Sequence, residues 1–450
     1  MRAVLSLVVL GGCLWKPDPP GVSDGGIDGM VDGGDAMTDG GGCANPLPSD
    51  LVVRRLARVA DMNGDGSDDI LVWGRLASGN GVASAYLILG RQPLQLSCFD
   101  RQFTFGASTA IELIDAWVGD ITTDAIPDLL LFARDDSPAA EYLIHFYEGT
   151  TGGFETTPQV VRASKTNFQS TIGGSLANPT PGYVIAWSGA SREVVFGGSQ
   201  EQLGGFELNA SNVLLDAKTL RQDMGGSQPL GLSGIEDLGV HYGSSPQEIV
   251  VVLSGSVQVI RHTGVRDQFE TFYDFQATPA NLTNSQPKFA RFYPESLGNS
   301  ETLAVAPVEQ TGYDVITYDR TGGIVVRLIN ASSDAAGRTM QDLIFEFVGG
   351  EPDMIDLVAM LESNTASELV VYPDVDLDNP TIVTPSPVKL TLARGTNALA
   401  IGNFDGDTVT PEQIVAFSTS PGGTLGACYQ YVSATPFPCL KPCGAAATCP

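Results

Sequence analysis

The chain has 450 residues, 43% of them hydrophobic and 17% charged, so it can bury one large core or two to three average ones. Its formal net charge of -28 excludes the basic surface that nucleic acid and anionic lipid require, and it favours divalent cations or basic partners. The 52 glycines and 28 prolines indicate many turns rather than long helices.

Residues 1–12 predict a lipoprotein signal peptide. Arg2 supplies a short positive region, and residues 3–10 form an apolar run that is too short to span a bilayer. The stretch LGGC that ends at Cys13 resembles the lipobox of bacterial lipoproteins. By that resemblance, Cys13 would carry lipid and anchor the exported protein at the outer membrane or cell surface. An ordinary secretory signal with an incidental cysteine is the alternative.

Residues 13–46 predict a disordered tether. Six aspartates and nine glycines fall within residues 14–42, and such a segment buries too little apolar surface to fold. A calcium-binding Gly/Asp repeat is the alternative, but it requires a strict period that these aspartates do not keep.

Residues 47–435 repeat one pattern, a polar loop rich in acids that ends in an apolar run. The first copy, VADMNGDGSDDILVWG at 59–74, places Asp61, Asn63 and Asp65 at alternate positions and Asp69 at the start of the run. The copy at 118–133 fits the same frame without a gap. Fainter copies lie at 173–187, 238–253, 291–306, 358–372 and 402–417.

Each copy is followed by strand-like runs with turn residues between them. About four short strands per 50 to 60 residues is typical of a propeller blade. The sequence therefore predicts an all-β fold, a seven-bladed β-propeller, with six or eight blades as alternatives. Residues 51–53 or the tail at 428–432 are candidates for closing the ring, with cysteine pairs as staples.

The loop pattern resembles the FG-GAP or VCBS-type repeat of integrin α-chain propellers and many bacterial surface proteins, over about residues 50–435. The resemblance implies that the acidic loops join the first and second strands of each blade on one face. It also implies a ligand on the opposite face, where the loops at 75–83 and 134–140 offer Arg75, Arg134, Asp135 and Asp136 as candidates.

The acidic loops are candidate calcium sites, because Ca²⁺ takes six to eight oxygen ligands in a flexible shell. The predicted ligands in the first copy are the side chains of Asp61, Asn63, Asp65 and Asp69 with the Ser67 carbonyl; Gly66 permits the sharp turn. Those in the second copy are Asp120, Asp124, Asp128 and the Ile126 carbonyl, and those in the seventh are Asn403, Asp405, Asp407 and Glu412. A solvated polar turn is the alternative.

The remaining copies predict bare turns without metal. Their acids, Glu248, Glu301 and Glu368, are expected to accept hydrogen bonds from the N–H groups of their own loops, which is a structural role.

With Cys13 lipidated, the remaining cysteines predict disulfides in an exported protein. Their pairing is open among 15 arrangements. They are Cys43, Cys98, Cys428, Cys439, Cys443 and Cys449, the last three within a predicted tail at 436–450. Zinc at that tail is the alternative, but no histidine lies near it.

The sequence predicts a binding protein rather than an enzyme. The histidines, His145, His241 and His262, lie in or beside predicted strands and are expected to be structural, and no catalytic motif is present. We therefore expect a monomeric binding or adhesion module for a glycan or protein partner. A structural envelope component and a polysaccharide hydrolase or lyase are the alternatives.

Overall fold

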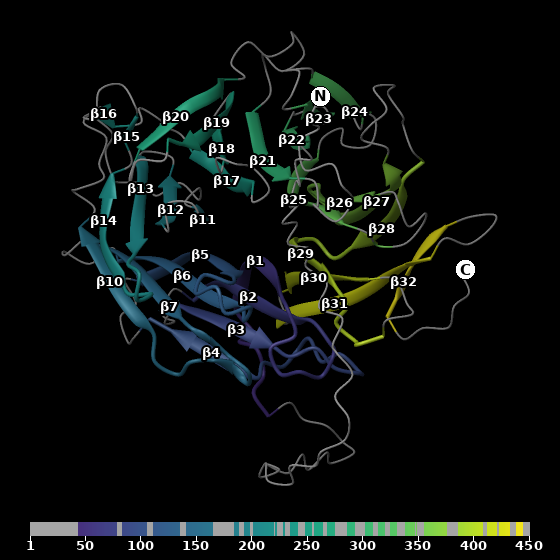
Figure 1. Ribbon diagram of the computed structural model, residues 1–450. Coiled ribbons are helices and arrows are strands. Elements are labelled where there is room, and N and C mark those ends of the chain that lie inside the picture. Colours follow the sequence, from purple (N-terminus) through teal and green to yellow (C-terminus); the bar gives the residue numbers. More distant parts are fainter. Residues whose placement is uncertain are drawn as a thin grey trace, which may run out of the picture. The chain divides into compact units, whose positions relative to one another are not determined.

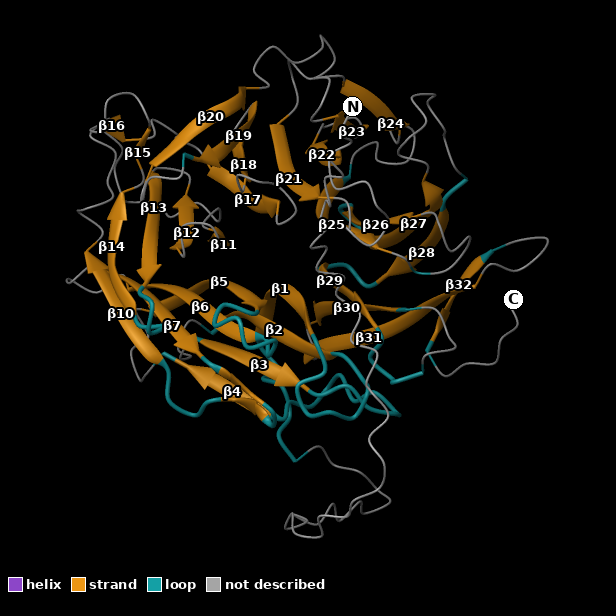
Figure 2. Ribbon diagram, in the orientation of Figure 1, coloured by secondary structure: helices purple, strands orange, loops and turns teal. Residues whose placement is uncertain are grey.

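The computed structural model describes residues 44–443 apart from 79–82, 106–110, 136–140, 165–183, 189–192, 199–200, 220, 223–227, 230–234, 242–247, 254–255, 264–267, 275–285, 293–301, 309–313, 320–324, 331–337, 347, 349–354, 376–385, 408–411, 421–422 and 433–437. All of these residues belong to the compact unit that begins at Ala44. Every regular element among them is a strand (Figure 2), and they contain no helix that could cross a membrane. Cys13 and the predicted tether to 43 lie outside the described residues.

Apart from one two-stranded hairpin, the strands form seven sheets, here called blades 1 to 7, each built from one continuous stretch of chain (Figure 1). Their strand pairs are antiparallel except for one short parallel pair in blade 4. Blade 1 consists of β1 (Leu51–Val59), β2 (Asp69–Leu76), β3 (Ser84–Ile88) and β4 (Arg101–Thr104). Blade 2 consists of β5 (Ile111–Gly119), β6 (Asp128–Asp135), β7 (Glu141–Tyr147) and β10 (Gln159–Ser164), with the hairpin β8 (Gly149–Thr150) and β9 (Gly153–Phe154) before β10. Blade 3 consists of β11 (Val184–Ser188), β12 (Glu193–Gly198), β13 (Glu201–Leu208) and β14 (Leu214–Thr219).

The other blades follow the same order. Blade 4 consists of β17 (Ile235–His241), β18 (Glu248–Leu253), β19 (Ser256–His262) and β20 (Gln268–Asp274), extended by β15 (Arg221–Gln222) and β16 (Gln228–Pro229). Blade 5 consists of β21 (Gln286–Phe292), β22 (Thr302–Val308), β23 (Asp314–Asp319) and β24 (Val325–Asn330). Blade 6 consists of β25 (Thr339–Glu346), β26 (Ile355–Glu362), β27 (Ser367–Val375) and β28 (Val388–Leu392). Blade 7 consists of β29 (Thr396–Gly402), β30 (Gln413–Ser420), β31 (Gly423–Val432) and β32 (Cys439–Pro442).

The first strand of every blade contacts the first strand of the next, from β1 through β5, β11, β17, β21 and β25 to β29, and β29 contacts β1. The blades therefore close into a ring, and the prediction of an all-β, seven-bladed β-propeller is confirmed.

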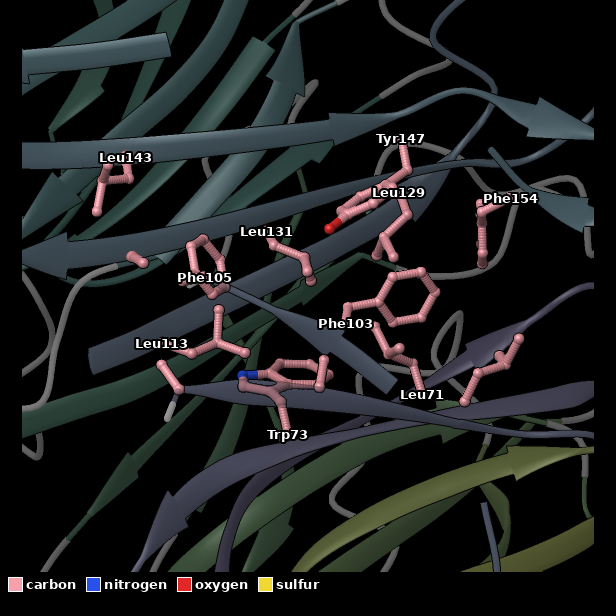
Figure 3. Packing of buried hydrophobic residues seen from close by; sticks show 14 of the residues in the cluster. Leu71, Trp73, Phe103, Phe105, Leu113, Leu129, Leu131, Leu143, Tyr147 and Phe154 are labelled. Atoms are coloured by element: carbon pink, nitrogen blue, oxygen red, sulfur yellow. The ribbon is translucent and has the colours of Figure 1, made fainter. Parts of the chain in front are cut away.

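The apolar core lies between neighbouring blades rather than inside one sheet. Between blades 1 and 2, Trp73 and Phe103 pack with Leu113, Leu131 and other side chains (Figure 3). Every residue of β6 is buried, because each face of the sheet meets a neighbouring blade. This explains why the second strands read as continuous apolar runs, such as ILVW and LLLF, instead of alternating with polar residues.

Among the described residues, no strand is shared between the first and last blades of the ring. Residues 51–53 begin β1, residues 428–432 lie in β31, and each belongs wholly to its own blade, so neither predicted closing segment exchanges strands. The predicted propeller ends at 435, whereas blade 7 includes β32 at Cys439–Pro442, which lies in the predicted tail. The seam is instead a packed core in which Val53, Val72 and Ile88 of blade 1 meet Val415 and Phe417 of blade 7.

Candidate functional site

The loop between β1 and β2, here called loop 1, folds around the Asp61 carboxylate. Its Oδ1 accepts hydrogen bonds from the N–H groups of Gly64 (2.7 Å) and Asp65 (3.2 Å), and its Oδ2 accepts one from Gly66 (2.7 Å). Gly64 and Gly66 have φ angles of 77° and 87°. Only glycine adopts this left-handed conformation without strain, so the two glycines allow the loop to curl around one carboxylate.

Two more side chains of loop 1 bond to each other and to the backbone. Asp65 Oδ1 accepts the Ser67 N–H (2.8 Å), and Asp65 Oδ2 accepts the Asn63 side-chain amide (2.8 Å). Asn63 Oδ1 in turn accepts the Asp65 N–H (3.1 Å). The predicted ligand side chains of this loop therefore turn inward, where they satisfy backbone donors.

Asp69, the first residue of β2, is completely buried and ties the loop to the sheet. Its Oδ2 accepts the Met62 N–H (3.1 Å), and its Oδ1 accepts the N–H of Gly90, which follows β3 (2.9 Å). Burial raises the pKa of Asp69 to about 7, against the two amide hydrogen bonds, and the charges of Asp65 and Asp61 raise it further.

The loop between β5 and β6, here called loop 2, repeats this arrangement. Asp120 accepts the N–H groups of Thr123 (2.6 Å), Asp124 (3.1 Å) and Ala125 (3.0 Å), and Asp124 accepts that of Ile126 (2.9 Å). Asp128 is completely buried and accepts the N–H groups of Ile121, Thr122 and Gly149 at 2.7 to 2.9 Å. Thr123 and Ala125, with φ angles of 66° and 69°, adopt the left-handed conformation of Gly64 and Gly66.

The loop between β29 and β30, here called loop 7, departs from the predicted frame. Gln413, not Glu412, is the first residue of the second strand, and its Oε1 accepts the N–H groups of Phe404 (2.6 Å) and Asp405 (3.2 Å). Asp405 Oδ1 accepts the Asp407 N–H (3.1 Å) and the Gln413 amide (2.8 Å). Glu412 was predicted as a metal ligand because it is an acid, but the residue that begins the apolar run takes this structural role.

Glu412 instead lies beside Arg58 of β1, with Oε1 3.5 Å from a guanidinium nitrogen. Burial raises the pKa of Glu412 to about 7, assisted by the charge of Glu346 and opposed by that of Arg58.

The other predicted loop acids differ in their surroundings. Glu248 is buried at the start of β18, but the loop before it lies outside the described residues, so its role in that turn stays a prediction. Glu368 lies one residue inside β27 and pairs with Arg338, so it does not cap its own loop; the prediction was wrong because the turn at 363–366 is short and is organised by Ser363. Glu301 and the loop at 173–183 lie outside the described residues.

The donor atoms of loop 1 suit calcium chemically. Carboxylate, amide and carbonyl oxygens are the ligands that Ca²⁺ takes, and a carboxylate oxygen that accepts one N–H keeps a second lone pair for a cation. In the described part of the chain, no group of three or more His, Cys, Asp or Glu side chains is arranged to hold a metal ion. Calcium at loops 1, 2 and 7 therefore stays a prediction.

Loops 1 and 7 join each other across the seam of the ring. The Asp68 N–H donates to the Asn403 carbonyl (2.7 Å), and the Asn403 N–H donates to Asp68 Oδ2 (2.8 Å). Arg58 Nε also contacts that carboxylate oxygen (2.8 Å), and the Arg91 N–H donates to the Phe404 carbonyl (3.0 Å). We call this set of contacts the clasp; sequence reasoning missed Asp68, although it is the acid adjacent to Asp69.

A cleft of about 630 Å³ lies beside the clasp, between blades 1 and 7. One wall is the connection from β3 to β4 at residues 92–97, and the other is blade 7 with loop 7. The blade 7 residues that line it are Asp405, Asp407, Gln413, Gly426, Cys428, Gln430 and Cys443. Gly426, Cys428 and Gln430 alternate along β31 and therefore share the face of the sheet that meets blade 1.

Two of the candidates predicted for the opposite face, Arg134 and Asp135, are buried and not available to a ligand. Arg134 and Asp135 are 4% and 7% exposed, and Arg134 pairs with Glu112 (2.9 Å). Asp136 lies outside the described residues. Arg75, at the end of β2, is exposed.

The described cysteines form disulfides. Cys428 pairs with Cys443, which ties β31 to the residue that follows β32 within blade 7, and Cys98 and Cys439 are disulfide-bonded as well. His145 and His262 are both 7% exposed and pack against Phe105 and Phe269.

No protein-family model matches this chain, and no curated protein is similar to it. Among solved structures, the crystal structure of BBS1N in complex with ARL6DN, soaked with lead, has a TM-score of 0.47 at 13% sequence identity and covers 87% of this chain and 95% of that one. A likeness this distant adds nothing to the fold given by the strand order.

Proposed function

We propose that this protein is an extracytoplasmic binding module, an FG-GAP or VCBS-like propeller held at the cell envelope by lipid on Cys13, that binds a glycan or protein partner in the cleft between blades 1 and 7. The cleft is the observation that supports this function. Its volume of about 630 Å³ falls within the range of about 300–1,000 Å³ usual for ligand sites. Two carboxylates and four glutamine side chains line it, and such groups orient a ligand.

We also propose that calcium stabilises loop 1, with Asp61, Asn63, Asp65, Asp69 and the Ser67 carbonyl as its ligands. Bound Ca²⁺ would supply positive charge among three carboxylates that otherwise repel one another. Because Asp68 and Asn403 bond to each other, a firmer loop 1 also supports loop 7 and the wall of the cleft.

The calcium proposal predicts a calcium-dependent melting temperature. At about 2 mM calcium, a site with a Kd near 10⁻⁴ M adds about 2 kcal/mol to the free energy of unfolding, which raises the melting temperature by a few degrees. The full chain is melted in calcium, in magnesium and in chelator. Asp61→Asn should lose the gain, whereas Glu141→Gln, which makes the same charge change on β7 of blade 2, should keep it.

Equal melts in calcium and chelator at saturation would show that the loops are plain turns. They would leave the proposed binding role untouched, because the cleft does not depend on a metal.

The binding role is tested separately by incubating the labelled full chain with glycan and peptide arrays. A specific ligand whose binding is blocked by a bulky residue at the mouth of the cleft, as in Ser97→Trp, supports the proposal. Failure to bind any ligand on either array would contradict it and would favour a structural envelope component.

A further inference from the structure

We infer that the cleft between blades 1 and 7 recognises a cationic side chain, lysine or arginine, presented by a peptide partner; the inference rests on the proposed binding function and names its ligand.

The first support is an amide in the wall of the cleft to which no described group bonds. Gln430 is 6% exposed, lines the cleft, and finds no hydrogen-bond partner for its side chain among the described residues. Its cross-strand neighbour Gln413 differs in this respect, because both the oxygen and the nitrogen of the Gln413 amide form hydrogen bonds within loop 7. A buried polar side chain is normally paired with protein, water or ligand, so the Gln430 amide is placed to accept a donor that enters the cleft.

The second support is the charge of the lining. Asp405 and Asp407 are its charged residues, and no lysine, arginine or histidine is among the described residues that line it. Asp405 Oδ1 accepts two protein hydrogen bonds, while no described group bonds to its Oδ2. The net charge of -28 on the whole chain also attracts basic partners over a distance. An anionic ligand is therefore disfavoured, and a hydrogen-bonding cation is favoured.

The third support is the shape and polarity of the other wall. Pro93, Leu94 and Leu96 provide apolar surface opposite the polar residues of blade 7. A lysine or arginine side chain has the matching design, with an aliphatic stem and a charged end that donates several hydrogen bonds. No aromatic ring is among the described lining residues, so the cleft lacks the surface that captures quaternary ammonium groups or stacks sugar rings.

The test is calorimetric titration of the full chain with a blocked peptide that contains a single arginine, and with the same peptide carrying citrulline. Citrulline keeps the shape of the arginine side chain without its charge. We expect the arginine peptide to bind at least about tenfold more tightly at physiological salt. The matching lysine and norleucine peptides form a second pair.

Two variants locate the site. Gln430→Leu keeps the volume and removes the amide, and Asp405→Asn removes the charge but keeps an acceptor for loop 7. Each should weaken binding of the cationic peptide about tenfold, whereas Glu141→Gln, a charge-matched change far along the chain on β7, should leave it within about twofold. Melting curves show which variants fold. If Gln430→Leu does not fold, Asp405→Asn alone tests the location of the site.

Equal affinity for arginine and citrulline, or equal weakening by Glu141→Gln, would overturn the inference. Competitive displacement of the peptide by calcium alone would also overturn it, because the two aspartates would then be metal ligands. If the arrays identify a neutral glycan whose binding Gln430→Leu abolishes, the binding module stands and the cationic ligand is wrong.

Discussion

Asp69, Asp128 and Gln413 perform one task in three blades. Each is the first residue of the second strand, each is buried, and each accepts the N–H of the buried apolar residue at the start of its loop: Met62, Ile121 or Phe404. A glutamine performs this task as well as an aspartate because the task needs an acceptor and not a charge. The side-chain oxygens of these three residues therefore stabilise the turn by themselves, and the turn does not need a metal ion to form.

His145 gives the protein a pH dependence of its own. Its ring is 4.2 Å from that of Phe105, and burial lowers its pKa to about 4, assisted by the charge of Arg162. The unfolded chain takes up this proton near pH 6.5, but the folded protein does so only near pH 4, so the folded state loses stability as the pH falls through that window. We expect a loss of about 3 kcal/mol from this group.

The measurement is denaturant unfolding of the wild type and of His145→Phe between pH 7 and pH 4. The difference in stability between them should change by the amount given above. If the free energy of unfolding falls equally in both proteins, carboxylates rather than His145 cause the acid sensitivity.

Sequence reasoning located Asp69 and Asp128 because both are acids directly before an apolar run. It chose Glu412 over Gln413 for the same reason, since it searched for acids; aligning the copies on the apolar runs would have found Gln413 before IVAF. Nothing in the sequence marks Gln430, because its position in the wall of the cleft depends on how blades 1 and 7 pack.

At the level of strands and loops, the second strand of each blade could be predicted from its apolar run, because the neighbouring blades bury both faces of the sheet. The positions of the loop acids could be predicted only where the loop has the same length as the first copy. Loop 2 fits without a gap, whereas blade 6 turns at 363–366, so a fixed frame carried Glu368 past the true start of its strand. Spacing alone cannot reveal an insertion or a shorter turn when the acids have been lost.

Loop 2 carries strain that loop 1 avoids. Ala125 has the left-handed conformation that Gly66 adopts freely, so Ala125→Gly should raise the free energy of unfolding by about 0.5–1 kcal/mol, the relief of strain less the entropy of a more flexible unfolded chain. The reverse change, Gly66→Ala, should lower it by about 0.5–1 kcal/mol, since an added Cβ there meets no neighbouring atom and the backbone strain is offset in part by the lower entropy of the unfolded chain.

Both variants are compared with the wild type by denaturant unfolding. Destabilisation by Ala125→Gly would contradict the argument, because it would mean that the alanine methyl group contributes more than the strain.

Across the whole ring, closure depends on the apolar contacts between blades 1 and 7 and on the clasp, since these blades share no described strand. Asp68→Ala removes the acceptor for the Asn403 N–H and the partner of Arg58, and we expect it to lower the free energy of unfolding by about 2 kcal/mol. Hydrogen exchange should accelerate in β1 and β29 and stay unchanged in β17–β20. Asp68→Asn keeps an acceptor and should have a smaller effect.

Faster exchange spread evenly over all blades, or none at the seam, would show that the apolar contacts hold the ring without the clasp. The blade number was predicted from the count of repeats, but the clasp was not, because its Asp68–Asn403 bonds join residues 335 positions apart.

Because blades 1 and 7 are joined through their packed faces, one face of blade 1 is covered late during synthesis. A ribosome makes blade 1 first, yet the face that carries Val53, Val72 and Ile88 finds its partners only on blade 7, which is made last. That apolar face stays uncovered until blade 7 has been made, and it is open to chaperones and to other nascent chains until then. The strands of blade 7 thus end the exposure of this face.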